Sequence, residues 1–291
     1  MAGRRGALGK ADLHIHTAVG DGMAEPAELL AYVEEETNLD VLAITDHDTL
    51  SGAYMTRELW ARGRYSFDMV MGMEVTTLEG HLLALFIEEP VPSLRPLQQT
   101  LTAIHARGGL AIIPHPLSWL TRSLGQSAIE AVLATGGEGA YFDGIELSNQ
   151  TLAARLTTQR ARELNATRYR LADVGGSDAH FLPDVGSAHT LFPLASAPPG
   201  SRPLLGHKAQ ELRRAILASK TTSAAARRPA QASVGLGQLL RQQWRGITVT
   251  PRMVGFGPTV ASFLRRFWPG RAAGPGGSGT TGGAAGPGGW V

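Results

Sequence analysis

The stretch ADLHIHTAVGDG near the start of the chain places His14 and His16 one residue apart, directly after a short apolar run. On an extended strand, residues i and i+2 point to the same face, so both imidazoles can face one metal ion while Ile15 faces the opposite side. Two imidazoles alone make a weak site, and further ligands must come from elsewhere in the chain. Because the chain has no cysteine, those ligands must be nitrogen or oxygen donors, that is, histidine and carboxylate side chains.

Similar side chains end or follow most of the other apolar runs. These candidates are Asp46 and His47 in LDVLAITDH, Glu74 in FDMVMGMEV, His115 in AIIPHP, and Asp178 and His180 in GGSDAH. In βα architectures, loops at the carboxyl ends of the strands converge into one ligand site. A single buried histidine is usually a hydrogen-bonded core residue, but five histidines at equivalent strand ends favour a shared functional site. Glu74 and Asp178 are the best additional ligands, since each follows a glycine that admits close approach.

Two further residues have less obvious positions. His81 opens the run HLLALFI instead of closing it, but a hairpin turn at Gly80 would bring His81 back close to Glu74 and into the same cleft. Asp21 lies between two glycines in VGDG, a context that suits a turn aspartate as well as a metal ligand. Both residues are therefore candidates for the same site.

The elements that must position these residues are also visible in the sequence. Between residues 12 and 221, short runs rich in Val, Ile and Leu alternate with stretches such as EPAELLAYVEEE and LQQTLTAIHARG, in which apolar residues recur at three- and four-residue spacing. This alternation predicts βα units around a largely parallel sheet, with the exception of the hairpin over MEVTTLEGHLLALF.

The charge of the chain is unevenly distributed. Of 27 Lys and Arg residues, eight follow Thr221, whereas all 25 Asp and Glu residues precede it. The basic character therefore belongs to the C-terminal end and is poor evidence that the body binds nucleic acid. We predict a domain over 11–221 and a basic, Gly- and Pro-rich extension over 222–291 whose end is disordered. The Arg- and aromatic-rich part of this extension could pack on the body or contact a partner or a membrane surface.

Hydropathy bears on the location of the protein. No run approaches the roughly 18 apolar residues of a spanning helix, and the residues MAGRRGALGK lack the apolar stretch of a secretory signal. We expect a cytoplasmic protein without a transmembrane segment.

Taken together, the motifs DLHIHTAVGDG, LAITDHDTLSG, GMEVTT, HLLALF, IIPHP, GIELSN and GGSDAH resemble, in the same order, those of the polymerase and histidinol phosphatase (PHP) superfamily of metal-dependent phosphoesterases. The resemblance spans residues 11–221. It implies an α/β fold, a distorted seven-stranded (β/α) barrel with two or three divalent metal ions at the mouth formed by the carboxyl ends of the strands. The identity of the ions stays open among Mn, Zn, Fe and Mg.

The resemblance also implies how the ligands are shared among the ions. The first ion would be held by His14, His16, Glu74 and Asp178. The second would be held by the bridging Glu74, His115 and His81, and the third by Asp21, His47 and His180. Many members of the superfamily carry histidine where this chain has Asp21. The aspartate resembles the smaller stand-alone phosphoesterases.

These features predict an enzyme that hydrolyses phosphate esters of a small metabolite or nucleotide with a metal-activated hydroxide. His47 or His180 would move a proton to the leaving group. Asp12 and Asp46, each beside a candidate ligand, are either ordinary strand-end aspartates or residues that orient the imidazoles. Arg122 is either the cation that contacts the substrate phosphate or a surface arginine.

Two alternatives stay open. The first is a 5′–3′ exonuclease acting on short oligonucleotides, for which the arginines of the extension would supply nonspecific attraction. The second is a noncatalytic module that binds metal or a phosphorylated ligand. The acidic body favours a small phosphorylated substrate and makes long nucleic acid an unfavourable partner, because a long polyanion needs a basic track. The complete set of candidate ligands argues against the noncatalytic module.

Overall fold

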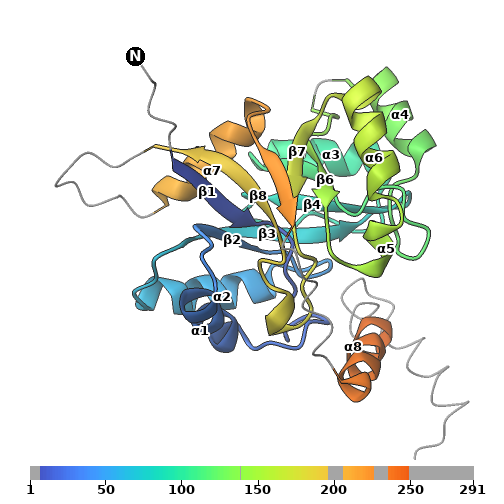
Figure 1. Cartoon of the computed structure of the whole chain (residues 1–291). Helices are drawn as coiled ribbons and strands as arrows, with labels where there is room; N and C mark the ends of the chain where they lie inside the picture. The colour runs from blue at the N-terminus through green and yellow to red at the C-terminus, as the bar shows by residue number, and fades with distance from the viewer. Residues whose placement is uncertain (1–6, 138, 196–205, 226–234, 249–291) are drawn as a thin grey trace, which may run out of the picture.

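The computed structural model describes residues 7–137, 139–195, 206–225 and 235–248 (Figure 1). Nine strands in these ranges form one sheet: β1 (Ala7–Asp12), β2 (Val41–Ile44), β3 (Asp68–Thr76), β4 (His81–Leu85), β5 (Leu110–Ile113), β6 (Gly144–Ser148), β7 (Ala172–Gly175), β8 (Ala188–Leu194) and β9 (Thr222–Ala225). Their order along the sheet is β7-β6-β5-β4-β3-β2-β1-β8-β9. The predicted α/β class is confirmed, whereas the expected count of seven strands is wrong by the two strands β8 and β9.

The sheet is mixed, with two parallel sections joined by a hairpin. Strands β1, β2 and β3 are mutually parallel, as are β5, β6 and β7, and the antiparallel strand β4 lies between the two sections. The predicted hairpin at Gly80 is confirmed: Thr76 pairs with His81, and the Thr77 amide donates to the Gly80 carbonyl over 2.9 Å. This turn aims His81 back toward the end of β3.

The two ends of the sheet approach each other and nearly close it into a barrel. The Ser148 hydroxyl at the end of β6 donates to the Ala224 carbonyl of β9 over 3.1 Å. The Gly175 amide of β7 donates to the Thr190 hydroxyl of β8 over 2.9 Å. A Cβ at Gly175 would lie 2.4 Å from the His189 carbonyl oxygen, so glycine is required for this approach.

Helices cover the sheet and fill its connections. They are α1 (Pro26–Glu36), α2 (Ser51–Arg62), α3 (Leu97–Ala106), α4 (Gln126–Thr135), α5 (Leu152–Arg155), α6 (Thr158–Leu164), the π-helix η1 (Asn165–Tyr169), the 3-10 helix η2 (Leu182–Asp184), α7 (His207–Leu217) and α8 (Leu236–Thr248). Helices α1 and α2 lie on the side of β2 and β3, whereas α3, α4 and α6 lie by β5 to β7 (Figure 1). Among the described residues, no helix is long and apolar enough to cross a bilayer.

Alternation along the strands divides the core into two layers. On β2, Val41 and Ala43 face the inside of the barrel, whereas Leu42 and Ile44 pack against the outer helices. Ile15 belongs to the outer layer, as predicted from its place between two metal-facing histidines. Helix α7 closes one end of the barrel interior with its buried face, which includes Leu212 and Ile216. The loops at the other end are left to form the site.

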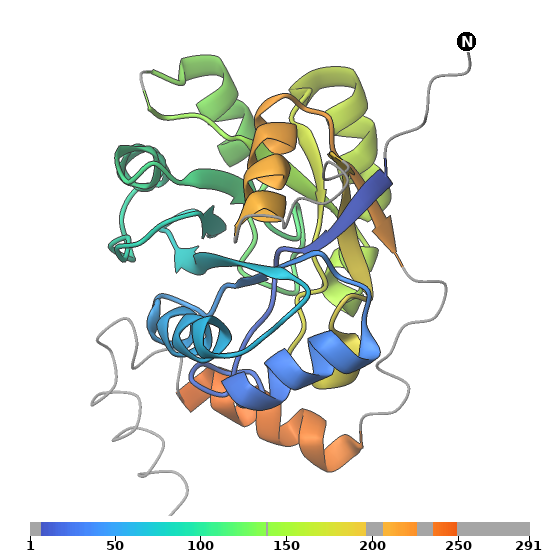
Figure 2. The same ribbon diagram turned by 90° about the vertical axis from the view of Figure 1, so that its left-hand side faces the viewer.

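The C-terminal extension is only partly described. Its first four residues form β9, which pairs with β8, and Leu236–Thr248 form α8. Figure 2 shows α8 at the end of the molecule opposite to the start of β1. The predicted disordered end and the remaining Arg- and aromatic-rich part lie outside the described residues.

Candidate metal centre

The loops at the carboxyl ends of the strands bring all nine predicted metal ligands together. Their side-chain nitrogen and oxygen atoms form four overlapping groups, in each of which the atoms lie within 4.8 Å of one another. The groups are His16, Asp21, His47 and His180; His14, His16 and Asp178; His14, Glu74 and His115; and His47, Glu74 and His81. One cluster therefore unites residues separated by more than 160 positions in the sequence.

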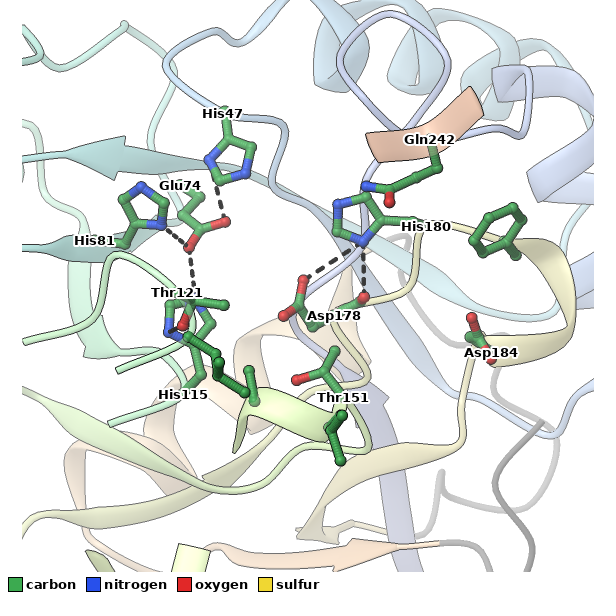
Figure 3. A pocket seen from close by; sticks show the side chains of 14 residues that line it. His47, Glu74, His81, His115, Thr121, Thr151, Asp178, His180, Asp184 and Gln242 are labelled. Carbon is green, nitrogen blue, oxygen red and sulfur yellow. Dashed lines mark hydrogen bonds and ion pairs between the residues drawn. The ribbon is translucent and has the colours of Figure 1, made fainter. Parts of the chain in front are cut away.

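Glu74 lies at the centre of the cluster, where its two carboxylate oxygens face five imidazoles. Its Oε1 lies 2.8 Å from His81 Nδ1 and 3.0 Å from His115 Nε2. Its Oε2 lies 3.1 Å from His14 Nε2, 3.3 Å from His16 Nε2 and 3.4 Å from His47 Nδ1. Figure 3 shows Glu74 between His47, His81 and His115. Each carboxylate oxygen of Glu74 therefore faces its own set of imidazoles.

Two other carboxylates serve separate parts of the cluster. Asp178 Oδ1 lies 3.3 Å from His16 Nε2 and 3.5 Å from His14 Nε2. Asp21 lies farther along the cluster, with Oδ2 3.3 Å from His180 Nε2 and Oδ1 3.4 Å from His16 Nδ1. The sequence around Asp21 suited both a turn aspartate and a metal ligand. In the structure, Asp21 lies in a turn and also belongs to the cluster.

Two residues of the cluster have a left-handed backbone. Asp178 has a φ of 56° and His115 a φ of 28°, a region that non-glycine residues seldom occupy. Such strain persists only where the surrounding structure holds it, and it concentrates at functional sites. Here it turns both side chains from their strand ends into the cluster.

The charges of the cluster depend on one another. Burial would raise the pKa of Glu74, but the imidazoles of His47, His81 and His14 hold that pKa well below its ordinary value. Burial opposes the charge of His16 as well, yet the neighbouring carboxylates of Asp178 and Glu74 raise its pKa to about 10. The carboxylates are thus anionic at neutral pH, as metal binding requires.

Several buried atoms of the cluster lack a hydrogen bond. These atoms are both ring nitrogens of His16, Oδ1 of Asp21, and Nδ1 of His47 and of His81. Buried polar atoms without a hydrogen-bond partner are rare in native proteins and call for an explanation such as a bound ion. Imidazole nitrogens and carboxylate oxygens converging in this way suit divalent ions such as Zn²⁺, Mn²⁺ and Fe²⁺. The donor set therefore fits the metal cluster that the sequence motifs imply.

Glu146, which the sequence reasoning did not identify, supports the cluster from behind. Its Oε1 lies 3.2 Å from His14 Nδ1, and its Oε2 accepts a hydrogen bond from the His115 amide over 2.7 Å. Asn149 donates to the same carboxylate over 2.8 Å. A carboxylate on Nδ1 fixes the tautomer of His14 and leaves Nε2 free for a metal. The only available signal was an acidic residue inside the apolar run of GIELSN.

The roles predicted for Asp12 and Asp46 need correction. Asp12 accepts hydrogen bonds from the backbone amides of Ser177 and Gly186, over 2.9 and 2.7 Å. Asp46 accepts from the amide and the hydroxyl of Thr17, over 2.6 and 2.7 Å. Both carboxylates therefore orient the backbone of the ligand-bearing loops, because they are directed at main-chain and hydroxyl groups.

The cluster forms the floor of a cavity of about 390 Å³. Phe181 also lines it, and Figure 3 shows Thr151, Asp184 and Gln242 around the cavity. Lysine and arginine are absent from the described residues that line it. Arg122 is directed elsewhere, since its guanidinium donates to the Thr77 carbonyl over 2.9 Å and supports the β3–β4 turn. Of the two roles considered for Arg122, this hydrogen bond supports a structural role rather than contact with the substrate.

Comparison with known proteins connects this site to other chains. A family model described as PHP-associated matches residues 158–221. An uncharacterized protein of Methanocaldococcus jannaschii is 34% identical over 151 residues, which cover 48% of this chain and 81% of that protein. The 5′–3′ exoribonuclease Rnm of Salmonella typhimurium is 36% identical over 104 residues, 34% of this chain and 35% of that enzyme.

Two further likenesses agree with these. Phosphoribosyl 1,2-cyclic phosphate 1,2-diphosphodiesterase of Eggerthella lenta is 33% identical over 102 residues, 33% of this chain and 38% of that enzyme. A two-domain Bacteroides vulgatus protein, which contains a predicted PHP-like metal-dependent phosphoesterase, shares the fold with a TM-score of 0.57 at 19% identity, over 84% of this chain and 71% of that chain. The motifs, the fold and these relatives show that the chain belongs to the PHP superfamily of metal-dependent phosphoesterases.

Proposed function

We propose that the protein hydrolyses the phosphate ester of a small metabolite or nucleotide, with two or three divalent metal ions held by the nine clustered residues. The observation that supports this function best is the position of the cluster at the floor of an open cavity. A cavity of about 390 Å³ lies within the usual range for small-molecule sites, about 300–1,000 Å³.

We assign the ligands as the resemblance to the superfamily implies, and the four groups of neighbouring atoms contain the same nine residues in overlapping sets. His14, His16, Glu74 and Asp178 would hold one ion, Glu74, His81 and His115 a second, and Asp21, His47 and His180 a third. When bound, such ions supply an activated water and neutralise the charge of the phosphoryl oxygens. Glu146 keeps the Nε2 atom of His14 directed at the cluster. The Ser123 hydroxyl forms a hydrogen bond of 2.7 Å with Nδ1 of His115.

His47 and His180 are the candidates for proton transfer to the leaving group. Their side chains are 13% and 17% exposed, whereas those of His14 and His16 are fully buried. Both rings line the cavity, where a substrate oxygen can reach them. A ring nitrogen that does not bind an ion would be able to give a proton to the departing alkoxide, which a residue below the cluster floor cannot do.

The lining of the cavity favours a small substrate with one phosphate. Binding of an oligonucleotide needs cationic side chains along the path of each phosphate. The described lining offers none, and it includes the carboxylate of Asp184. Among the described residues of the cavity, positive charge for a phosphate would therefore come from ions bound by the cluster.

Exonuclease activity on short oligonucleotides is the second candidate, because the Salmonella relative named an exoribonuclease shares 36% identity with part of this chain.

A substrate panel separates the two candidates. The metal-loaded protein is offered 4-nitrophenyl phosphate, a ribonucleoside 5′-monophosphate and a 5′-phosphorylated dinucleotide, and released phosphate and nucleotide are measured. Hydrolysis of the monoesters with at least tenfold preference over the dinucleotide is expected. The reverse preference would establish the exonuclease, and turnover of none of them would contradict the proposal.

A further inference from the structure

Helix α8 belongs to the stretch that the sequence separates from the catalytic domain, yet it contacts the metal centre. Gln242, in the middle of α8, is 8% exposed and lines the cavity. Its side chain extends from α8 toward His180 in Figure 3. The outer wall of the cavity is thus built in part from a helix that follows the sheet by ten residues of chain.

Arg245 fastens α8 to the loop that carries Asp21. Its guanidinium donates to the Ala18 carbonyl and, over 2.8 Å, to the Gly20 carbonyl. One turn of helix separates Arg245 from Gln242, so both side chains project toward the same side of α8. A cation that binds two carbonyls of one loop orients the helix relative to that loop.

The loop is itself firmly attached to the body of the protein. Thr17 binds Asp46 through its amide and its hydroxyl, and the Gly20 amide donates to the Thr17 carbonyl over 3.0 Å. At Gly246, next to Arg245, an added Cβ would lie 3.6 Å from Asp21 Oδ2. The backbone of α8 therefore passes directly over a candidate metal ligand.

The opposite face of α8 is exposed. Leu240 and Trp244 are 62% and 57% exposed, in contrast to Gln242. Among the described side chains of α8, the polar Gln242 faces the cavity and the polar Arg245 faces the loop.

We propose that α8 is part of the active site, with Gln242 as a specificity-determining residue and Arg245 as a positioning residue. This inference rests on the proposed function. The Gln242 side chain brings both donor and acceptor atoms to the wall of the cavity. Thr151 and Asp184 line the same cavity with a hydroxyl and a carboxylate. The outer wall therefore suits an alcohol that carries several hydroxyl groups, and the carboxylate disfavours a second phosphate.

The role of Gln242 is tested with two substrates that differ in their leaving groups. We expect Gln242→Ala to lower kcat/KM about tenfold for a ribonucleoside 5′-monophosphate, because a hydrogen bond to the leaving group is lost. For 4-nitrophenyl phosphate, whose leaving group has no hydroxyl, the change should stay below about twofold. Trp244→Ala on the exposed face is the control and should leave both values unchanged. Equal effects of Gln242→Ala on both substrates would overturn the specificity role.

The role of Arg245 is tested without turnover, by hydrogen exchange of the full chain. In Arg245→Ala, the amides of residues 17–22 and 236–248 should exchange at least about tenfold faster than in the wild type and in Trp244→Ala. Unchanged exchange would overturn the docking of α8. If the wild type hydrolyses no phosphate ester while the exchange result holds, the proposed function and the specificity of Gln242 fail, and the docking stands.

Discussion

Glu74 joins the separate parts of the metal centre, because each of its oxygens faces a different set of imidazoles. A carboxylate surrounded by this many ring nitrogens is an arrangement that suits bound metal ions. The backbone of β3 supports this position through a bridge between Glu74 and His47. At the scale of single residues, Glu74 is therefore the most sensitive point of the cluster.

We expect Glu74→Gln to abolish activity by about 10³-fold or more, since the amide cannot bridge two cations and several kcal/mol of charge stabilisation are lost. Steady-state kinetics with saturating metal measures the loss. Glu58→Gln, the same change at a side chain that is 64% exposed on α2, is the control. Activity within tenfold of the wild type in Glu74→Gln would exclude its bridging role.

Glu146 acts through His14 and the backbone of His115, and its removal should have a smaller effect. We expect Glu146→Gln to weaken metal affinity or activity about 10- to 100-fold, the usual effect of removing a carboxylate that supports a metal-bound histidine. Calorimetric titration of the metal-free protein with Zn²⁺ or Mn²⁺ measures the change in affinity. An unchanged dissociation constant in a folded variant would show that Glu146 serves packing only.

At the scale of elements, His105 links α3 to the start of β6. Its Nδ1 faces the Gly139 carbonyl at 2.6 Å and its Nε2 faces Asp143 Oδ2 at 2.9 Å. Both neighbours are acceptors, so the ring donates from both nitrogens when it is protonated. Burial lowers the pKa of His105, but these two bonds raise it above the ordinary 6.5.

The raised pKa makes this link dependent on pH. The stabilisation is complete below about pH 6.5, the pKa of the unfolded chain, and is lost as pH rises through the higher pKa of the folded state. The free energy of unfolding of the wild type minus that of His105→Asn should therefore decrease between pH 6 and pH 9. Urea unfolding at several pH values measures this difference, in which the titration of the metal cluster cancels. A difference that does not change with pH would contradict the account.

Helix α2 begins against the support of the metal centre, and Gly52 permits the contact. A Cβ at this position would lie 1.8 Å from Asp46 Oδ2 and 2.6 Å from Thr17 Oγ1. We expect Gly52→Ala to destabilise the protein by about 1–3 kcal/mol, because Asp46 or the helix must move. Chemical denaturation measures the change. Ala61→Gly on the same helix is a useful comparison, because its expected cost of about 1 kcal/mol comes from helix propensity alone.

The elements that could be predicted are those whose own residue pattern indicates a buried strand, a helix or a turn. The continuous apolar run of β2 and the turn at Gly80 were predictable because a short apolar run and turn chemistry are local properties of the sequence. Strand β9, with the sequence TSAA, was not predictable, since it lacks large apolar side chains and Thr222 is its one β-branched residue. It forms a strand through its pairing with β8, a tertiary interaction that leaves no periodic signal.

The same distinction separates the site residues. The ligands were predictable because they recur at strand ends, where the fold brings distant positions together. Gln242 and Arg245 were not, because their role depends on how α8 docks against a loop more than 200 positions earlier in the chain. Arg122 shows the opposite case, in which proximity to His115 in sequence did not bring its guanidinium into the cavity.

At the scale of the whole molecule, metal binding should stabilise the fold, because the cluster connects loops from both sections of the sheet. A ligand that binds the folded state alone adds about 2.7 kcal/mol at a concentration 100 times its dissociation constant. Tm should rise by several degrees when metal is added to the metal-free protein and fall again with a chelator. Differential scanning calorimetry measures this shift. An identical Tm with and without metal would contradict a structural link between the cluster and the fold.

The central claim is that nine converging side chains hold metal ions that carry out phosphate ester hydrolysis. The most direct test measures metal content and 4-nitrophenyl phosphate turnover on the same preparations of the wild type and of His14→Ala/His16→Ala. We expect the wild type to hold at least two ions per chain and to hydrolyse the substrate. The double variant should lose bound metal and turnover together. A wild type that binds no metal after reconstitution, or a double variant with undiminished turnover, would contradict the central claim.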